Sequence, residues 1–390
     1  MQTGLILLGF AYVLSQFFRA FLAVLTGPLL RDLGIGADVL ATASGLWFLS
    51  FAAMQIPVGW ALDTIGPRRT AGWLLLGGGG GGAVLFALAQ GPAHIHGAML
   101  LIGVGCSPVL MASFYIFART FPPARFATLA ALMIGVGTVG NLISSYPMAW
   151  ASDAIGWRAS MWVLAAACGA VAIGLLASVR DPAKPQTEAS GSLLDLLRMR
   201  ALWLLLPIMF VNYAPIAAIR GLWIGPYLTD VFALNTRQIG IGTLIMSLAM
   251  IAGTLAYGPL DRVLGTRKWV VFSGNLVTTG LLLLLIAFSA TGPWLSVALM
   301  AAIGFFGASF PVIIAHARGF FPPHLTGRGV TLMNLFGIGG VGIVQFASGR
   351  IHTAYAGGPA QAPYIAIFTF LAAALAIGLL IYARSRDTIG

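Results

Sequence analysis

Charged residues are scarce in this chain of 390 residues. Asp, Glu, Lys and Arg make up 8% of it, whereas 59% is hydrophobic, and the mean hydropathy is +0.94. Soluble domains carry about 25% charged residues, so the composition excludes a soluble globular fold. It predicts an integral membrane protein that has membrane lipids as partners.

Acidic residues are rarer still. There are 10 of them against 21 basic residues, which gives a formal charge of +11. In a soluble chain this excess would suggest nucleic acid, but only two of the basic residues are Lys and none lies in a run of five. We therefore expect no nucleic-acid partner and attribute the charge to membrane topology.

Residues that build reactive sites are also few. The two cysteines, Cys106 and Cys168, lie in apolar stretches and indicate neither a disulfide framework nor a metal site. No catalytic triad, metal cluster or paired carboxylate is recognisable, so we expect neither an enzyme nor a cofactor. The start, MQTGLILLGF, lacks a basic region and a cleavage site, so we expect its apolar segment to remain as a span.

What the chain has in abundance is long apolar segments. A bilayer core about 30 Å thick requires roughly 20 residues of helix. Twelve segments are long enough: 5–29, 40–62, 71–91, 97–119, 127–151, 158–179, 202–228, 238–260, 269–290, 294–318, 328–349 and 362–383. The predicted fold class is an all-α membrane protein with twelve transmembrane helices.

The distribution of basic residues predicts the orientation. With the N-terminus inside, only Arg31, Arg158, Arg237 and Arg350 lie outside. The cytoplasmic side receives Arg68, Arg69, Arg119, Arg125, Arg180, Lys184, Arg198, Arg200, Arg262, Arg267, Lys268, Arg318, Arg328, Arg384 and Arg386. Basic residues favour the cytoplasmic side, so we expect a multi-pass protein of the cell inner membrane with both termini cytoplasmic.

The chain also repeats itself. Tyr12 and Arg19 are matched by Tyr213 and Arg220, DTIGPRR at 63 by DRVLGTRK at 261, and ARTFPP at 118 by ARGFFPP at 317. Between the copies, residues 180–200 form a polar stretch typical of a linker. We predict two pseudo-symmetric bundles of six helices, 1–179 and 201–390, joined by this cytoplasmic linker.

The loop between the second and third segments carries a family resemblance. In GWALDTIGPRR, residues Gly59, Asp63, Gly66, Arg68 and Arg69 resemble the hallmark loop of the major facilitator superfamily. A degraded copy follows the eighth segment as Asp261, Gly265, Arg267 and Lys268. The first copy departs from the family pattern at Thr64, where the family usually has Arg, and at Pro67, which is inserted before the basic pair. The second copy has one extra residue between Asp261 and Gly265.

The resemblance implies the major facilitator fold and a gating role for these loops. In the family this Asp caps a helix of the opposite half, and the basic pair fixes neighbouring cytoplasmic helix ends. A carboxylate at a helix N-terminus is stabilising, so the role is physically reasonable. The alternative is that Arg68 and Arg69 only mark the cytoplasmic side.

Two arginines stand inside apolar segments. Arg19 and Arg220 lie about twelve and ten residues before the outer ends of their helices, which predicts matched depths of roughly 15 to 18 Å. Arg at a helix centre costs about 2.5 to 3.5 kcal/mol, and no acidic residue lies mid-membrane as a partner. Each Arg therefore faces water and a ligand, or is tied to backbone carbonyls at a helix break.

Polar residues accompany both arginines. Tyr12 and Tyr213 precede them by seven residues, which places each pair on one helix face, and Gln16 and Asn212 are nearby. The resemblance implies that the first, fourth, seventh and tenth helices line a central cavity. The predicted substrate site therefore combines two guanidinium groups with neutral contacts and suits a small anion.

One histidine and two groups of glycines are further candidates for a role in function or packing. His316 in the tenth segment is a candidate for proton coupling or a hydrogen-bonded structural residue. Glycines recur in the fifth and eleventh segments, where we expect close packing between the two halves. These glycines are Gly135, Gly137, Gly140, Gly337, Gly339, Gly340 and Gly342.

The predicted function is secondary transport of a small organic or inorganic anion by alternating access, in a monomer. Exchange, uniport and symport all remain open. One alternative is an exporter of drugs or metabolites, although exporters of cationic drugs generally need a buried acid that this sequence lacks. Another is a membrane sensor that binds a ligand without transporting it.

Overall fold

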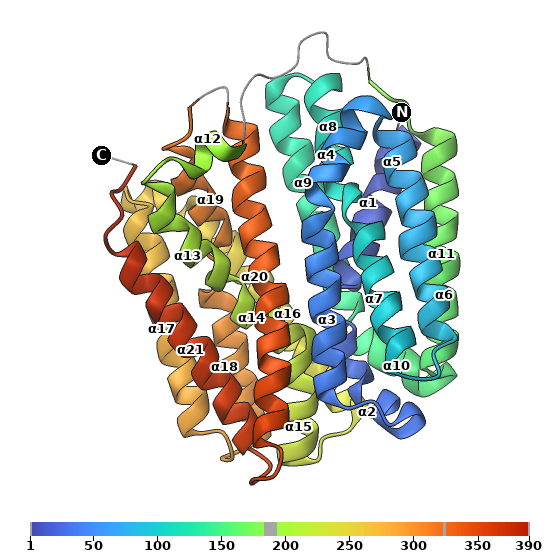
Figure 1. Ribbon diagram of the computed structural model, residues 1–390, viewed down its shortest axis with the longest axis vertical. Coiled ribbons are helices and arrows are strands. Elements are labelled where there is room, and N and C mark those ends of the chain that lie inside the picture. Colours follow the sequence, from blue (N-terminus) through green and yellow to red (C-terminus); the bar gives the residue numbers. More distant parts are fainter. Residues whose placement is uncertain (1, 183–192, 323–324, 389–390) are drawn as a thin grey trace. The chain divides into compact units, whose positions relative to one another are not determined.

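The structure of the protein is a computed structural model that describes residues 2–182, 193–322 and 325–388 (Figure 1). All regular elements in these ranges are helices. The chain divides into two units, Met1–Thr187 and Glu188–Gly390, called here the N-terminal and C-terminal units. The fold class predicted from the sequence is confirmed.

The described residues of the N-terminal unit form eleven α-helices and one π-helical segment. They are α1 (Gln2–Phe17), α2 (Leu22–Leu33), α3 (Ala37–Ala53), α4 (Gln55–Thr64), α5 (Pro67–Leu74), η1 (Leu75–Gly80), α6 (Gly81–Ala87), α7 (Pro92–Cys106), α8 (Pro108–Thr120), α9 (Pro123–Ile143), α10 (Tyr146–Ile155) and α11 (Trp157–Ser178).

The C-terminal unit is built in the same way. Its described elements are α12 (Leu193–Leu197), α13 (Leu202–Asn212), α14 (Ala214–Ala218), η2 (Ile219–Trp223), α15 (Ile224–Phe232), α16 (Thr236–Leu264), α17 (Lys268–Ala287), α18 (Pro293–Phe306), α19 (Phe310–Arg318), α20 (Thr326–Tyr355) and α21 (Ala362–Tyr382). Of the predicted linker 180–200, residues 183–192 lie outside the described residues, so the linker remains a prediction.

The described helices provide up to twelve membrane spans. Ten uninterrupted or gently bent helical stretches are long and apolar enough to cross a bilayer. Two bent pairs also qualify, α1 with α2 at 56° and α9 with α10 at 42°, which brings the number to twelve if each pair is one span. Helices satisfy their backbone hydrogen bonds internally, which an apolar surrounding requires.

The same helix pairing occurs in both units. In the N-terminal unit α1 packs on α9, α3 on α7, and α6 on α11. In the C-terminal unit α13 packs on α20, α16 on α18, and α17 on α21. These are the first and fifth, second and fourth, and third and sixth spans of each bundle, so the internal repeat extends to the packing.

Glycine makes the pairing of the first and fifth spans possible. A Cβ atom on Gly140 of α9 would overlap the carbonyl oxygen of Val13 in α1, and one on Gly340 of α20 would overlap that of Phe210 in α13. Small residues allow helix backbones to approach this closely. Both glycines therefore lie against helices of their own unit, in contrast to the packing between halves that we expected.

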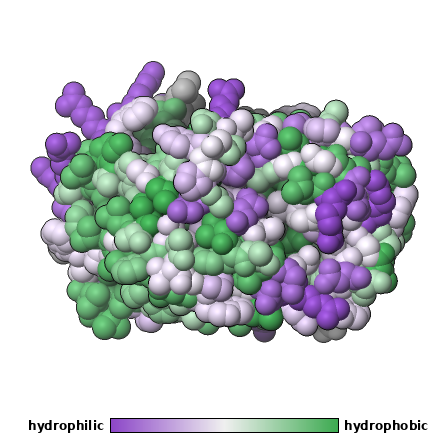
Figure 2. Space-filling view, turned by 90° about the horizontal axis from the view of Figure 1, so that it is seen from below, coloured by the Kyte–Doolittle hydropathy of each residue, from purple (hydrophilic) through white to green (hydrophobic). Residues whose placement is uncertain are grey.

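The outer surface of the helices is apolar. Large hydrophobic side chains are strongly exposed, with Leu255 at 72%, Val263 at 75% and Leu380 at 70%. Figure 2, which views the protein from below along the helices, shows hydrophobic areas between separate hydrophilic groups at that end. Exposed apolar surface on this scale marks contact with lipid rather than water.

The close contact at Gly140 generates a stability prediction. Gly140→Ala adds a methyl group where the Val13 carbonyl already lies, so we expect a lower melting temperature, equivalent to about 1 to 3 kcal/mol of overpacking. Thermal unfolding of the detergent-purified protein measures this. Gly135→Ala is the matched control, because a Cβ there meets nothing within 4 Å; equal melting temperatures for both variants would contradict the role of Gly140.

Candidate functional site

Arg19 lies at the break between α1 and α2. The backbone N–H groups of Arg19 and Ala20 bond to the carbonyls of Gln16 and Phe17 three residues back, at 3.4 and 3.1 Å. These tighter turns interrupt the α-helix without a proline or glycine. The aromatic rings of Phe17, Phe18 and Phe21 contact one another around the break, with centroids 5.5 to 5.7 Å apart.

The guanidinium of Arg19 rests on aromatic rings of α3. Its central carbon lies 5.4 Å from the ring centre of Trp47 and 5.1 Å from that of Phe51. Rings of this kind attract cations through their negative faces. This arrangement partly stabilises the positive charge in an apolar surrounding.

No acidic residue neutralises Arg19 in the part of the chain that the structure describes. The residue is half-buried, and its Nε atom is buried without a hydrogen-bond acceptor among the described residues. The sequence left open that Arg19 is tied to backbone carbonyls at a helix break. Arg19 does stand at a helix break, but its side chain bonds to no carbonyl of the described residues.

Tyr12 and Gln16 lie together in the last two turns of α1. The Gln16 amide donates to the Tyr12 hydroxyl at 3.1 Å, and both side chains are buried. A Cβ on Gly137 would overlap the Tyr12 ring, so this ring packs on α9. The two residues share a face as expected, but Arg19 reaches instead to α3.

Arg220 occupies a different backbone environment. It lies in η2, a π-helical turn within the seventh span, and is only 1% exposed. Single π-helical turns are rare and occur frequently at functional sites. Three residues on, the indole N–H of Trp223 donates to Ser348 of α20 at 2.9 Å, which fixes this turn to the eleventh span.

The amide nitrogen of Asn212 is hydrogen-bonded to residues of its own unit. It lies 2.6 Å from Asn275 Oδ1, 3.0 Å from Ser309 Oγ and 3.3 Å from the Gly307 carbonyl. The seventh span breaks after Asn212 and the tenth breaks at 307–309. The amide nitrogen of Asn212 therefore joins two helix breaks to α17, whereas its Oδ1 atom is buried without a donor among the described residues. The ligand contact at Asn212 stays a prediction.

Tyr213 follows directly and is half-buried. Its ring lies 6.0 Å from that of Phe310. The structure thus places Tyr213 beside the tenth span, within the C-terminal unit.

A second repeat fixes the true register between the first and seventh spans. Gly27-Pro28 and Asp32 are matched by Gly225-Pro226 and Asp230, all at an offset of 198. The Trp157 indole donates to Asp32 at 2.7 Å, and the Tyr364 hydroxyl donates to Asp230. Each carboxylate therefore anchors the start of the sixth span of its own unit.

This register corrects the expected equivalence of the two arginines. The offset of 198 pairs Arg19 with Ala217, and Arg220 with Leu22. The glycine contacts agree, because Val13 and Phe210 differ by 197. Arg220 therefore lies about one helical turn further along its span than the position equivalent to Arg19, so the Tyr–Arg spacing is not part of the structural repeat.

The loop residues form ion pairs inside the N-terminal unit. Asp63 lies 3.5 Å from Arg119 at the end of α8. Arg68 donates its backbone N–H to Asp181 at 2.8 Å, and its Nε atom lies 3.7 Å from the same carboxylate. Arg69 is exposed.

The C-terminal unit has the corresponding contacts. Arg267 donates to Asp261 at 3.2 Å. The carboxylate of Asp387 accepts from the backbone N–H groups of Arg267 and Lys268 at 3.2 and 3.4 Å, and from the Thr266 hydroxyl. The Lys268 ammonium lies 5.2 Å from the Trp269 ring centre.

Asp181 and Asp387 are functional candidates that sequence reasoning missed. Each follows the last span of its unit and caps the N-terminus of the third span, α5 or α17. A carboxylate at a helix N-terminus stabilises the helix, because its negative charge interacts favourably with the helix dipole. The repeated dipeptide Arg180-Asp181 and Arg386-Asp387 was the available signal.

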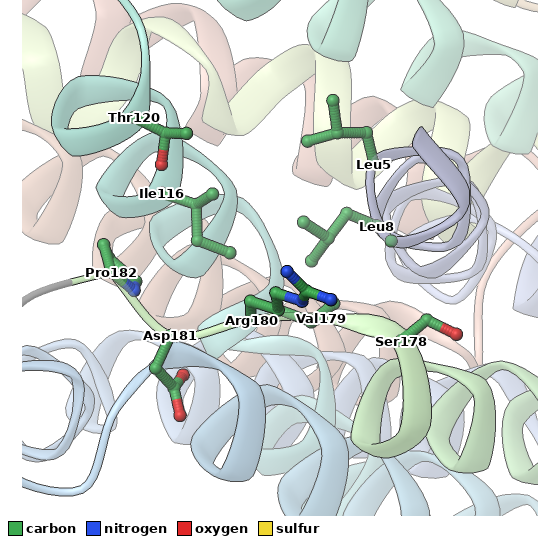
Figure 3. Close-up of a pocket in the computed structure, with 10 residues that line it drawn as sticks. Leu5, Leu8, Ile116, Thr120, Ser178, Val179, Arg180, Asp181 and Pro182 are labelled. Atoms are coloured by element: carbon green, nitrogen blue, oxygen red, sulfur yellow. The ribbon is translucent and has the colours of Figure 1, made fainter. Parts of the chain in front are cut away.

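A cavity of about 150 Å³ adjoins the Asp181 cap. Figure 3 shows Leu5 and Leu8 of α1 facing Ile116 and Thr120 of α8 across it. Asp181 also lines it while reaching to Arg68. None of the predicted anion-binding residues lines this cavity. The cavity lies between the Asp181 cap, α1 and α8 and is separate from the predicted anion site.

His316 is fully buried and engaged on both sides. Its Nδ1 atom lies 2.6 Å from the Tyr382 hydroxyl and its Nε2 atom 2.8 Å from the Arg386 carbonyl. A carbonyl only accepts, so Nε2 carries the proton and Nδ1 accepts from Tyr382. This geometry joins α19 to the end of α21 and favours the structural interpretation.

The acidic caps predict which loop residues contribute most to the thermal stability of the protein. Asp387→Ala should lower the melting temperature by the equivalent of about 0.5 to 2 kcal/mol, because it leaves the start of α17 without its acceptor. Asp63→Ala should change it less, since exposed ion pairs contribute about 0 to 1 kcal/mol. Asp195→Ala, at another exposed pair, is the control; a larger effect of Asp63→Ala than of Asp387→Ala would refute the ranking.

Comparisons with known proteins agree with this architecture. Residues 8–223, more than half of the chain, match the profile of the Major Facilitator Superfamily. The "Probable L-galactonate transporter" of Escherichia coli (strain K12) is 24% identical over 281 residues, covering 66% of this chain and 60% of the relative. The "Gallate transporter" of Pseudomonas putida is 28% identical over 122 residues, covering 30% and 26%. These matches span less than two thirds of either relative.

Solved structures share the fold over nearly the whole length. A bacterial homolog of the human lysosomal transporter Spinster, in an inward-facing and occupied conformation, has a TM-score of 0.77 at 15% identity and covers 98% of this chain and 96% of that chain. The D-xylose-proton symporter has a TM-score of 0.78 at 13% identity and covers 99% and 98%. Together with the profile match and the repeated six-span bundles, this establishes that the chain belongs to the Major Facilitator Superfamily.

Proposed function

We propose that this chain transports a small organic carboxylate across the cell inner membrane by alternating access, and that Arg19 binds the carboxylate. The observation that carries the proposal is a half-buried guanidinium that has aromatic rings beneath it and no acidic partner among the described residues. A bound anion supplies the missing charge. An arginine offers it two parallel hydrogen bonds, which a carboxylate accepts.

The relatives support the substrate class. One is described as a probable galactonate transporter and the other as a gallate transporter. Galactonate and gallate differ in shape, but both are hydroxylated carboxylates. We therefore expect the carboxylate to be the common element that Arg19 binds, with hydroxyl groups contacting other polar residues.

Arg220 is the proposed second cationic contact. It stands in a π-helical turn of the seventh span, where the local backbone is irregular. Tyr213 is half-buried and remains a candidate for a neutral contact. Tyr12 and Gln16 bond to each other, and we propose that they support the α1 face rather than bind the charge.

The proposed mechanism uses the loops as latches. Asp63, Arg68, Arg69, Asp261, Arg267 and Lys268 lie at the ends of the second and third spans of each unit. The caps made by Asp181 and Asp387 hold those ends inside each unit, which supports movement of each bundle as a rigid body. We place both termini in the cytoplasm on the distribution of basic residues.

The first test replaces arginine by lysine. Arg19→Lys and Arg220→Lys keep the charge but lose the planar fork, so we expect the affinity for galactonate or gallate to fall about 10- to 150-fold, or roughly 1.5 to 3 kcal/mol. Calorimetry on purified protein measures the affinity. Arg31→Lys, at an exposed position outside the proposed site, is the control; wild-type affinity in the Arg19→Lys variant would refute the proposed site.

The second test concerns coupling. When the site is empty, Arg19 has no counter-charge among the described residues, and closing the site around it strengthens this penalty as water leaves. A bound carboxylate removes the penalty, so the loaded carrier should change conformation faster than the empty one.

Labelled galactonate or gallate uptake into proteoliposomes distinguishes the two situations. We expect faster uptake into vesicles that contain the unlabelled compound than into empty vesicles, with no membrane potential or pH gradient. Equal rates would show that the empty carrier returns freely and would exclude exchange as the preferred mode, whereas the binding site would be unaffected by that result.

A further inference from the structure

The indole N–H of Trp47 is a buried hydrogen-bond donor without an acceptor. Trp47 is 0% exposed, and its Nε1 atom bonds to none of the described residues. Buried donors are nearly always paired, because losing water without gaining a partner is unfavourable. An unpaired donor at such a position calls for a specific explanation.

Trp47 is held rigidly by its neighbours. Its ring stacks on that of Phe51 one helical turn along α3, with centroids 5.1 Å apart and planes 21° apart. It also contacts Phe48 edge-on at 4.9 Å. The ring therefore keeps one orientation, and its N–H points in a fixed direction.

A second buried donor without an acceptor among the described residues, next to Trp47, belongs to Arg19. The guanidinium carbon lies 5.4 Å from the Trp47 ring centre, and the Nε atom of Arg19 also lacks an acceptor. Two unpaired buried donors, one on α3 and one at the α1–α2 break, thus belong to side chains that contact each other. Neither donor has an acceptor among the described residues, and beside a positive charge an anionic acceptor is favoured.

We propose that the Trp47 indole N–H is a second hydrogen-bond donor to the carboxylate that Arg19 binds. This inference rests on the proposed function and extends it by one residue of the binding site. A carboxylate has two oxygens and about four acceptor positions, so one anion satisfies both the guanidinium and the indole. The two donors come from α3 and from the α1–α2 break, so the anion also connects the second span to the first.

The arrangement also accounts for selectivity. A neutral substrate pairs the indole N–H but leaves the Arg19 charge uncompensated, and a cation is repelled by it. A carboxylate serves both donors at once. The Trp47 N–H therefore favours ligands whose acceptor atom lies in the right position, and the Arg19 charge favours anionic ligands over neutral and cationic ones.

Trp47→Phe tests this proposal, since phenylalanine keeps an aromatic face under Arg19 and removes only the N–H and part of the ring. We expect calorimetry with gallate and with galactonate to show at least about 10-fold weaker binding of whichever probe the wild type binds. Without ligand, the melting temperature should fall less than in Trp223→Phe, because both variants lose ring volume but only Trp223→Phe also loses a hydrogen bond. Phe51→Leu, which keeps the N–H, should bind more tightly than Trp47→Phe.

Trp223→Phe is the matched control for stability. Trp223 is equally buried, but its N–H donates to Ser348, so its loss should lower the melting temperature. If Trp47→Phe lowers the melting temperature by as much as Trp223→Phe, the Trp47 N–H has a structural partner and the inference is overturned.

The binding outcomes separate the two proposals. Wild-type affinity in Trp47→Phe together with weak binding in Arg19→Lys would overturn this inference and leave the proposed function standing. Wild-type affinity in both variants would overturn both. Failure of the wild type to bind either probe at millimolar concentration would overturn the proposed carboxylate site and, with it, the role of Trp47.

Discussion

A guanidinium that is removed from water without a carboxylate partner is the constraint on which the proposed site depends. Placing Arg at the centre of a membrane helix costs about 2.5 to 3.5 kcal/mol, and the faces of Trp47 and Phe51 offset this only in part. The remainder has to come from water in a cavity or from an anion. The local structure follows from this requirement, because Arg19 stands where the helix is broken and its side chain reaches α3.

Close helix packing provides the rigid frame around that break. Gly140 and Gly340 bring the fifth span of each unit onto the backbone of the first. Their contacts fix the helical register and reveal that Arg220 is displaced by about one turn from the position equivalent to Arg19. The two units thus share one scaffold but place their arginines at different positions along the first span of each unit.

The carboxylates of the spans and loops that the structure describes serve as anchors. Asp32 and Asp230 accept from aromatic donors at the sixth spans, and Asp181 and Asp387 cap the third spans. Each of these contacts lies within one unit. The acids therefore stabilise each bundle, and none of these four is paired with Arg19.

The sequence by itself determined the fold class, the twelve apolar segments and the family, because hydrophobic length and a short loop motif are local properties. It also identified Arg19 as an unusual residue from its surroundings alone. It could not decide the partners of that residue. The matched spacing of Tyr12 with Arg19 and Tyr213 with Arg220 predicted equivalence, yet the Gly-Pro motifs and glycine contacts set another register. Asn212 was predicted to contact the substrate, and the meeting of two helix breaks gives its amide nitrogen the partners Asn275 and Ser309. Nothing in the sequence distinguished Trp47 from the other apolar residues of its segment, and only the tertiary structure shows that its N–H is buried next to Arg19 without an acceptor among the described residues. These decisions depend on contacts between residues far apart in the chain, which periodicity and composition do not encode.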